Sequence, residues 1–489
     1  MQILKYLALL LACSLFVYSP AKADRPNVLF IAVDDLRPEL ETYGAVPKTP
    51  NLNKIALTGV RFDRAYCQQA VCGASRLSIM SGLYPTMTKE QTFHVDGWRE
   101  RHPDLLTMNQ HFRKSGFKTI GIGKIYHGTQ GVGVDPKNWN RWIKLDSPEY
   151  LVPENNEKMM AFKKAGKVGD EKDPPKGPTT ESADVNDNAY ADGKRARRAA
   201  KILKGLSEAK DKKPFFLAVG FTKPHLPFNA PKKYWDLYDR ADFKMPPNKG
   251  LPPGYPSYAA NLPAWEMKKY CDYVGEMPTD FPEEMNQRLL HGYAACVSYM
   301  DANVGVVMDA LAETGLDKNT IVVFWGDHGW KLGDHSSWCK HTNLECDTRV
   351  PLIVRAPGFS KDKQCNEEVE LIDLYPTLCE LTGIKTPQHC QGKSFKGLLE
   401  NPDSEHRDCA YSSYPAGKKQ IGHSIRMGDV RYTQWHLNSD GSRTNKRVLT
   451  DLAKDPGEVT NVIDDAAYSE ILAKAEKLLK QRIEKAKSK

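Results

Sequence analysis

Short apolar runs that end in charged residues constrain the fold of this chain more than any other feature. Each run has the length and the Val, Ile and Phe content of a buried strand. They are Val28–Val33, Lys118–Gly123, Phe215–Phe221, Thr320–Trp325 and Pro351–Val354. Helical stretches separate them, among them Asn51–Leu57, Tyr190–Leu206 and Glu284–Thr314. This alternation predicts an α/β fold with a large central, mostly parallel sheet flanked by helices.

The composition is that of a folded chain long enough for more than one domain. Its 489 residues are 40% hydrophobic and 27% charged, which excludes disorder, collagen and coiled coil as the main architecture. Beyond residue 407 the pattern changes to short strand-like pieces and a final amphipathic helix. We therefore predict a large domain over residues 24–406 and a smaller α+β subdomain with an antiparallel sheet over residues 407–489. The Lys-, Glu-, Gly- and Pro-rich segment Glu154–Thr180 is expected to be a solvated surface loop.

The N-terminus has the organisation of an export signal. A lysine at position 5 precedes an apolar stretch, and Ala21-Lys22-Ala23 is a small-x-small cleavage site. Residues 1–23 are therefore predicted to be a signal peptide, too short to be a stable membrane span, and the protein is predicted to be secreted or periplasmic. A lipoprotein box ending at Cys13 is the alternative. Loss of Lys5 and Lys22 would lower the net charge from +8 to +6, which favours a polyanionic partner only weakly; we expect no nucleic-acid partner.

Two of the apolar runs end in residues that suit a metal ion. Asp34 and Asp35 follow the first run, and Asp327 and His328 follow the fourth. The carboxyl ends of parallel strands meet at one edge of a sheet, where ligands of such folds bind. Adjacent carboxylates repel unless a cation neutralises them, and their oxygens suit a hard ion such as calcium or magnesium. The aspartate pair alone is also compatible with a turn or a cap, and His328 with a hydrogen-bond donor beside the ion.

A cysteine begins a predicted helix in the segment Cys72-Gly73-Ala74-Ser75-Arg76. A thiol at a helix N-terminus beside an arginine is expected to have enhanced thiolate character. From the local sequence alone, a buried structural thiol or a disulfide to Cys67 is the favoured interpretation. Ten cysteines follow the predicted signal peptide, and their pairing cannot be read from the sequence.

A set of ordered motifs gives the chain a family resemblance. Residues 49–76 read TPNLNKIALTGVRFDRAYCQQAVCGASR, and NVLFIAVDD, GIGKIYHG, KPHLPF, FWGDHGWKLGDH, WCKHTN, SIRMGDVRYTQW and DPGEVTN occur elsewhere. Over nearly its whole mature length the chain resembles the type I sulfatases of the alkaline phosphatase-like superfamily, particularly iduronate-2-sulfatases and exported bacterial polysaccharide sulfatases. Ala74 stands where proline is common in the cysteine motif, which leaves open which maturase acts on it.

The resemblance implies a modified cysteine and one calcium ion. A maturase would oxidise Cys72 to formylglycine (3-oxoalanine), whose hydrate attacks sulfur with one hydroxyl; deprotonation of the other hydroxyl expels sulfate as the aldehyde re-forms. The implied calcium ligands are Asp34, Asp35, Cys72, Asp327 and His328.

The resemblance also implies roles for the remaining charged residues. Arg76 would orient and polarise residue 72, while Lys124 and Lys340 would bind sulfate oxygens. His127 would deprotonate the hydrate, and His225 would protonate and bind the leaving alcohol. Outside this family context, a single lysine or histidine in a loop usually faces solvent.

The sequence contains fewer indications of which residues recognise the substrate. Trp98, Arg99 and Trp330 are candidates for the pocket wall because they lie near these motifs, and so are three aspartates in a polar insertion. The tryptophans are equally compatible with core or surface positions, whereas loop caps or turns are the favoured interpretation of the aspartates; these aspartates are Asp184, Asp187 and Asp192.

We interpret the chain as an exported, calcium-dependent sulfatase that acts on sulfated oligosaccharides or polysaccharides, at a chain end. A 2-O-sulfated uronic acid is the leading hypothesis for the sugar, with sulfated galactans and ulvan-type polymers open. One alternative is a phosphatase or phosphodiesterase of the same superfamily, which would need two zinc ions and a Ser or Thr nucleophile. The other alternative is an inactive exported glycan-binding protein in which Cys72 stays unmodified.

Overall fold

The computed structural model describes residues 25–93, 95–128, 135, 137–145, 147–166, 174–260, 265–273 and 281–488. The predicted signal peptide, including Cys13, lies outside the described residues. Within them, we find no helix with the length and hydrophobicity needed to traverse a lipid bilayer.

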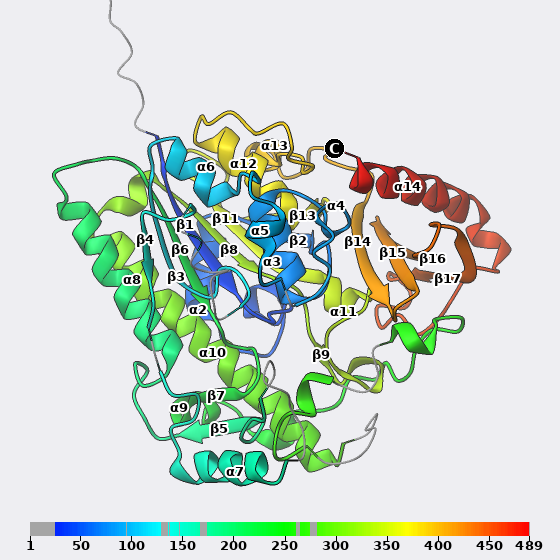
Figure 1. Cartoon of the computed structure of the whole chain (residues 1–489), viewed down its shortest axis with the longest axis horizontal. Coiled ribbons are helices and arrows are strands. Elements are labelled where there is room, and N and C mark those ends of the chain that lie inside the picture. Colours follow the sequence, from blue (N-terminus) through cyan, green and yellow to red (C-terminus); the bar gives the residue numbers. More distant parts are fainter. Residues whose placement is uncertain are drawn as a thin grey trace, which may run out of the picture.

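A large twisted sheet forms the centre of the molecule (Figure 1). Its strands β1, β3, β4, β6 and β8 run parallel, whereas β11 is antiparallel to both of its neighbours. This confirms the prediction of a large, mostly parallel sheet. In spatial order the strands are β12 (Lys363–Cys365), β2 (Val60–Tyr66), β11 (Arg349–Arg355), β8 (Thr320–Gly326), β1 (Asn27–Val33), β6 (Phe215–Phe221), β3 (Lys118–Gly123) and β4 (Arg141–Ile143), with β13 (Val369–Glu370) also paired to β2.

Helices cover both faces of this sheet, and alternate residues of β1 contribute to two separate cores. Leu29, Ile31 and Val33 pack with α2 (Pro50–Leu57), α8 (Ala191–Glu208) and α10 (Glu283–Glu313). Val28, Phe30 and Ala32 pack with α3 (Cys72–Ser81), α6 (Met108–Lys114) and α12 (Leu374–Leu381). Because side chains alternate along a strand, a strand buried on both faces needs the continuous apolar run that the sequence shows.

The segment predicted to be a solvated loop is partly helical. Helix α7 (Pro153–Lys164) occupies its first part, and strand β5 (Thr180–Ala183) begins at its end and pairs with β7 (Phe228–Pro231). Pro153 at the first turn, Glu154 beside it and two lysines in the last turn all favour a helix at this position. No residue of α7 is buried, so the apolar stripe that normally indicates a helix is missing.

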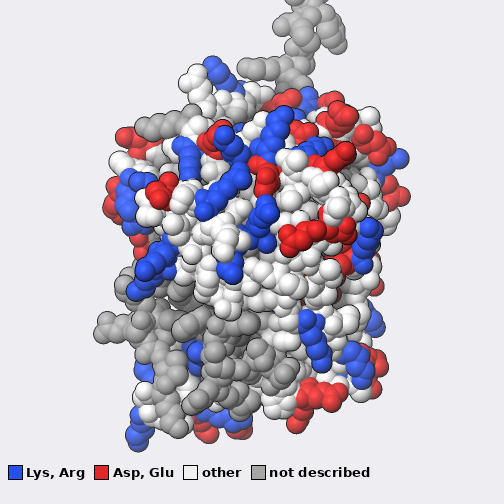
Figure 2. Space-filling view, turned by 90° about the vertical axis from the view of Figure 1, so that its right-hand side faces the viewer, with Lys and Arg blue, Asp and Glu red and all other residues white. Residues whose placement is uncertain are grey.

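A second, antiparallel sheet follows near the C-terminus, as predicted. It consists of β14 (Ala410–Ala416), β15 (Gln420–Met427), β16 (Val430–Leu437) and β17 (Arg443–Asp451). Helix α14 (Ser469–Lys487) contributes Ala475, Leu479 and Ile483 to the core of this sheet. Figure 2 shows acidic and basic side chains intermingled on the face that contains this region, rather than one continuous basic patch. The division at residue 407 stays a prediction.

Strand β14 is hydrogen-bonded to the segment that directly follows β2 of the large sheet. The backbone N–H of Ser413 donates to the carbonyl of Gln68 at 2.9 Å, and the Ser412 hydroxyl donates to the Cys67 carbonyl at 2.5 Å. The C-terminal sheet is therefore anchored a few residues from the start of α3. The remaining short strands and α-helices of the described residues are α4 (Pro85–Thr88), α5 (Trp98–Arg101), α9 (Lys232–Trp235), β9 (Lys331–Leu332), β10 (Trp338–Cys339), α11 (Glu345–Thr348) and α13 (Lys396–Glu400).

Candidate active site

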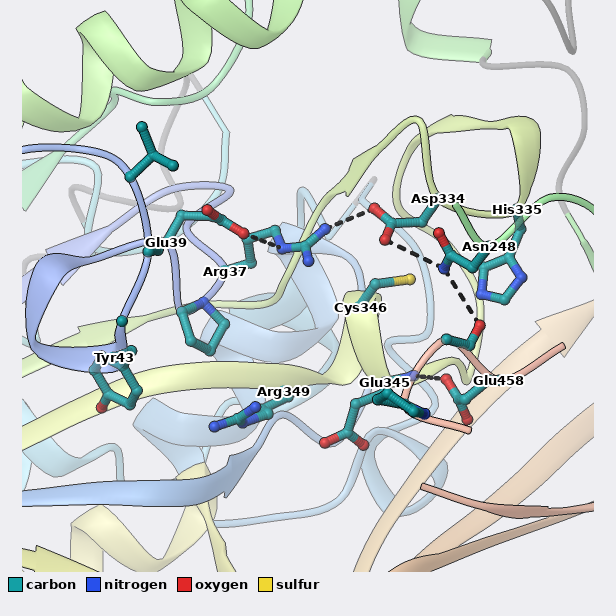
Figure 3. Close-up of a pocket in the computed structure, with 16 residues that line it drawn as sticks. Arg37, Glu39, Tyr43, Asn248, Asp334, His335, Glu345, Cys346, Arg349 and Glu458 are labelled. Atoms are coloured by element: carbon teal, nitrogen blue, oxygen red, sulfur yellow. Dashed lines mark hydrogen bonds and ion pairs between the residues drawn. The ribbon is translucent and has the colours of Figure 1, made fainter. Parts of the chain in front are cut away.

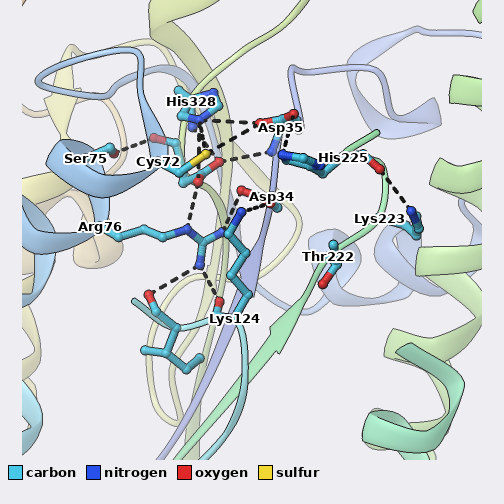
Figure 4. A network of polar contacts seen from close by, with 12 residues as sticks. Asp34, Asp35, Cys72, Ser75, Arg76, Lys124, Thr222, Lys223, His225 and His328 are labelled. Atoms are coloured by element: carbon cyan, nitrogen blue, oxygen red, sulfur yellow. Dashed lines mark hydrogen bonds and ion pairs between the residues drawn. The ribbon is translucent and has the colours of Figure 1, made fainter. Parts of the chain in front are cut away.

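Residues from four neighbouring strand ends converge at the carboxyl edge of the large sheet (Figure 4). Asp34 and Asp35 follow β1, while Asp327 and His328 follow β8. Lys124 follows β3, and His225 lies in the turn after β6. The register pairs Val33 with both Phe221 and Gly326, so the ends of β1, β6 and β8 lie level and deliver their polar residues to one place.

Unusual backbone conformations shape this edge. Asp35 has a φ of 56°, in the left-handed region that asparagine and aspartate tolerate better than most residues. Its N–H donates to Asp327 Oδ1 at 3.1 Å, and its carbonyl accepts a hydrogen bond from the Tyr293 hydroxyl at 2.9 Å. Gly220 lets the backbone of Lys124 approach, because a Cβ there would lie 2.2 Å from the Lys124 carbonyl oxygen.

Arg76 links the carboxylate of Asp34, which follows β1, to that of Asp327, which follows β8. It is fully buried one turn into α3, where Nε donates to Asp327 Oδ2 at 2.8 Å and Nη2 donates to Asp34 Oδ1 at 3.3 Å. Its Nη1 donates to the carbonyls of Lys124 and Ile125. The Arg76 guanidinium therefore donates its hydrogen bonds to other groups of the protein, which favours a role in holding the site together.

Two lysines face the aspartate pair. Lys124 forms an ion pair with Asp34, and Lys340 Nζ lies 2.7 Å from Asp35 Oδ1. Burial by itself would raise the pKa of Asp34, but the cations of Lys124 and Arg76 hold that pKa well below its usual range. Burial raises the pKa of Asp35 well above its usual value despite Lys340, and Asp34 and Glu266 act in the same direction. The cations of the protein therefore do not fully neutralise the negative charge of the Asp35 carboxylate.

The donor set fits a divalent metal ion. Ligand atoms of Asp34, Cys72, Asp327 and His328 all lie within 4.8 Å of one another, and so do those of Asp34, Asp35 and His225. Asp35 Oδ2 is buried and has no hydrogen-bond partner among the described residues. An orphaned carboxylate oxygen in a group rich in carboxylates is what a hard cation would satisfy.

Cys72 is the first residue of α3 and lies at the centre of this cluster. Its Sγ is 3.2 Å from His328 Nε2 and 3.9 Å from Asp35 Oδ1. The prediction of an enhanced thiolate is wrong, because burial and then Asp34 raise the pKa of the Cys72 thiol well above its ordinary value. The nearby arginine cannot reverse this, since its charge is taken up by Asp327 and Asp34. Cys67 and Cys72 are both free thiols in this structure.

The two candidate histidines have different surroundings. His225 Nδ1 donates to the Leu226 carbonyl at 2.5 Å, so Nε2 is the nitrogen that faces Asp35 Oδ2, at 3.8 Å. His127 lines a cavity of about 370 Å³ together with Lys124, Trp142, Arg195 and other residues. Burial and then Lys124 lower the pKa of both imidazoles, that of His127 to about 3. Both rings are therefore neutral at neutral pH.

The predicted pocket-wall residues do not all reach this cluster. Trp98 is buried and stacked on Tyr126, with ring centroids 5.8 Å apart, so it belongs to the core. Arg99 packs over the Trp98 ring and forms an ion pair with Asp135 at 2.5 Å. Trp330 is buried beneath Lys340, whose Nζ lies 4.9 Å from its ring centroid, so it supports that lysine.

The three candidate aspartates have local roles. Asp184 is exposed, and Asp187 forms an ion pair with Lys233 at 2.8 Å. Asp192 is buried and accepts hydrogen bonds from the backbone N–H groups of Thr222 and Lys223. It therefore anchors the turn that carries His225 and does not form the wall of the site.

Sequence reasoning missed three residues next to Lys340. Glu266 Oε2 accepts a hydrogen bond from Lys340 Nζ at 3.1 Å, and its Oε1 lies 3.0 Å from His341 Nε2. The other ring nitrogen of His341 lies 2.8 Å from the Tyr414 hydroxyl. His341 could have been noticed as the neighbour of Lys340 in WCKHTN, but Glu266 and Tyr414 lie in segments without a comparable signal.

A separate cavity of about 380 Å³ lies between the large sheet and the C-terminal region (Figure 3). Arg37 Nη1 and Asp334 Oδ2 pair across it at 2.6 Å, and the backbone N–H of Glu345 donates to Glu458. None of the candidate site residues described above lines it.

Comparisons with known proteins agree with this geometry. The family model described as Sulfatase matches residues 26–384, and one described as N-sulphoglucosamine sulphohydrolase, C-terminal, matches residues 333–487. Fold and site together define a hydrolase of the alkaline phosphatase-like superfamily. More particularly, the chain belongs to the sulfatase family and is a sulfuric ester hydrolase.

Individual relatives cover most of the chain. Iduronate 2-sulfatase of Homo sapiens is 31% identical, over 84% of this chain and 85% of the relative. A sulfatase of Formosa agariphila is 30% identical, over 90% of this chain and 83% of the relative. The solved structure of BT4656 in complex with its substrate D-glucosamine-2-N,6-O-disulfate has a TM-score of 0.72 at 22% identity, covering 95% of this chain and 98% of that one; at this identity the likeness concerns the fold alone.

Proposed function

We propose that this sulfatase is exported and hydrolyses O-sulfate esters of carbohydrates by means of a formylglycine formed from Cys72. The observation that carries the proposal is the position of Cys72. It begins α3 within the charged cluster, with Sγ 3.2 Å from His328 Nε2, and the two lysines that pair with Asp34 and Asp35 are close enough to act on its charge. A reacting group at this position would have two cations nearby for a sulfate group.

Lys124 and Lys340 are the residues that would bind the sulfate oxygens. An ammonium group has three donors, and neither lysine has all three engaged by side-chain acceptors among the described residues. Burial would lower the pKa of each, but Asp34 in one case and Asp35 in the other raise it above its ordinary value, so both lysines stay charged. Arg76, by contrast, would act by holding Asp34 and Asp327 in place.

Asp34, Asp35, Asp327 and His328 would hold one calcium ion next to residue 72. When bound, the ion would offset negative charge on the sulfate. A formylglycine hydrate would supply a nucleophile whose second hydroxyl allows sulfate to be released without a new attack by water.

The histidines would move protons. His225 exposes Nε2 toward Asp35, and its Nδ1–H is fixed by the Leu226 carbonyl. To protonate the leaving alcohol, Nε2 must first gain a proton, which the anionic sulfate ester would favour by raising the lowered pKa of this imidazole. His127 has an unpartnered, buried Nδ1 among the described residues and would act as the base for the hydrate.

We propose a sulfated oligosaccharide or polysaccharide as the substrate, attacked at a chain end. The iduronate 2-sulfatase relatives support a 2-O-sulfated uronic acid, and the glucosamine disulfate bound to BT4656 supports glycosaminoglycan-type sugars more generally. Sulfated galactans and ulvan-type polymers belong in the same test.

Peptide mass spectrometry across residue 72 tests the proposal, on protein from its native host or co-expressed with a maturase. We expect formylglycine in place of cysteine, and sulfate release from a panel of sulfated glycans measured by ion chromatography. The Cys72→Ala variant should release none, whereas Cys67→Ala, which removes another buried free thiol, should retain turnover. Unmodified Cys72 in native-host protein, together with glycan binding without sulfate release, would support the inactive glycan-binding alternative and contradict the proposal. Turnover of phosphate esters by a protein with two zinc ions would support the phosphatase alternative.

A further inference from the structure

Lys340 contacts more groups of the protein than Lys124, the other lysine of the site. Its side chain is fully buried, and its Nζ contacts Asp35 Oδ1 at 2.7 Å and both oxygens of Glu266, at 3.0 and 3.1 Å. The Trp330 ring lies on another side of the ammonium, with its centroid at 4.9 Å. Lys124 contacts only one carboxylate, that of Asp34, among the described residues. Lys340 therefore has a second anionic partner that Lys124 lacks.

The second partner belongs to a hydrogen-bonded chain that leads away from the site. Glu266 Oε1 lies 3.0 Å from His341 Nε2, and His341 Nδ1 lies 2.8 Å from the Tyr414 hydroxyl. Because a carboxylate only accepts, Nε2 must carry the proton, and Nδ1 of the neutral ring then accepts from Tyr414. Every donor in the chain therefore has an acceptor, so the position of each group depends on the next.

Tyr414 lies in β14, the first strand of the C-terminal antiparallel sheet. Strand β14 is itself bonded to the segment just before α3, through Ser412 and Cys67. The chain of Glu266, His341 and Tyr414 thus connects Lys340 to the C-terminal sheet. Lys340 Nζ donates one hydrogen bond to Asp35 and one to Glu266, so one of its three N–H groups has no hydrogen-bond acceptor among the described residues.

We propose that Glu266 is a positioning residue, braced by His341 and Tyr414, that aims the free N–H of Lys340 at a sulfate oxygen. This inference rests on the proposed role of Lys340 as a sulfate ligand. Glu266 acts through Lys340 and need not touch the substrate. The C-terminal sheet contributes to sulfate binding through Tyr414.

Two explanations of Glu266 make opposite predictions. If it were only a negative charge near the anion, its replacement by glutamine would remove repulsion and tighten sulfate binding. If it positions Lys340, the same replacement would weaken sulfate binding. Tyr414→Phe separates the effects further, because it removes one hydrogen bond without changing any charge.

The test measures the dissociation constant of inorganic sulfate by calorimetry, on the calcium-loaded, formylglycine-containing full chain. We expect a roughly three- to tenfold weaker affinity for Tyr414→Phe, the range for one hydrogen bond, and at least about tenfold for Glu266→Gln, which loses a charge-assisted pair. The matched control is Tyr411→Phe: Tyr411 lies in the same strand and bonds to His423 Nδ1 at 2.6 Å, away from Lys340. It should bind sulfate as the wild type does.

Lys340→Ala separates failure of this inference from failure of the proposed function. If Lys340→Ala binds sulfate as tightly as the wild type, the proposed role of Lys340 is wrong. If Lys340→Ala weakens binding but Tyr414→Phe does not, or if Glu266→Gln binds sulfate more tightly, the positioning role is overturned. Thermal unfolding of each variant shows that the comparison is made on folded protein, and a KM for sugar sulfate that rises at unchanged melting temperature supports positioning.

Discussion

Replacing Arg76 with alanine tests whether the buried charge network supports the fold as well as the site. Arg76 is fully buried and bonded to Asp327 at 2.8 Å and to Asp34 at 3.3 Å, and it also satisfies the carbonyls of Lys124 and Ile125. Its removal leaves the buried carboxylates of Asp34 and Asp327 without the cation that they share. Breaking a buried ion pair in this way typically costs about 3–5 kcal/mol, and we expect the free energy of unfolding to fall by that amount.

Calcium should recover part of the loss. Asp34 and Asp327 are proposed calcium ligands, and without Arg76 they carry more uncompensated negative charge for the ion to neutralise. Stabilisation by a ligand grows with the ratio of its concentration to its dissociation constant. We therefore expect added calcium to stabilise Arg76→Ala more than the wild type.

The assay is urea denaturation followed by tryptophan fluorescence, with and without calcium, for wild type, Arg76→Ala and Arg76→Lys. Lysine keeps the charge but cannot reproduce the planar fork, so an intermediate loss is expected. Arg447→Ala is the control: its ion pair with Glu476 has a distance of 3.0 Å but lies at the surface, and such pairs contribute about 1 kcal/mol or less. Unfolding of Arg76→Ala at the same urea concentration as the wild type would refute the reasoning.

Three further predictions concern the reaction and the pH dependence of stability. A Cys72→Ser variant should lose turnover unless the maturase converts serine, so full activity with an unconverted serine, detected by peptide mass spectrometry, would contradict the mechanism. His225→Ala should lower kcat by roughly 10²–10⁴ for alkyl sulfates but much less for aryl sulfates, whose good leaving groups need little acid assistance; equal losses for both would argue against a general acid. His423 is buried in strand β15 of the C-terminal sheet, and burial lowers its pKa well below the usual value. The unfolded chain therefore binds a proton near pH 6.5 that the folded chain rejects, and His423 should cost about 1.4 kcal/mol of stability per pH unit below 6.5. Denaturation at pH 7.5 and 5.5 should show a smaller acid loss for His423→Gln than for wild type, and an unchanged loss would contradict this account.

The sequence by itself determined five strands of the large sheet, β1, β3, β6, β8 and β11, and the polar residues at the ends of several of them. A strand buried on both faces must be continuously apolar, and its end must be polar where it meets solvent or a ligand. Both requirements act locally, so Asp34 and Asp35 after β1, Asp327 after β8 and Lys124 after β3 can be read along the chain. Helix α7 was missed for the same reason, because it buries no residue and so leaves no apolar pattern.

Only the tertiary structure decided the pKa values of the site residues and which distant residues hold them in position. The local sequence places Arg76 beside Cys72, but the fold brings Asp34 and Asp327 to that arginine. Burial and the carboxylates therefore set the pKa of the Cys72 thiol. Trp98 lies near the motifs in sequence, yet it packs into the core on Tyr126. The contact of Glu266 with Lys340 spans 74 positions, and that of His341 with Tyr414 spans 73. Distances between residues so far apart are set by how the sheets and helices pack, and no local pattern encodes them.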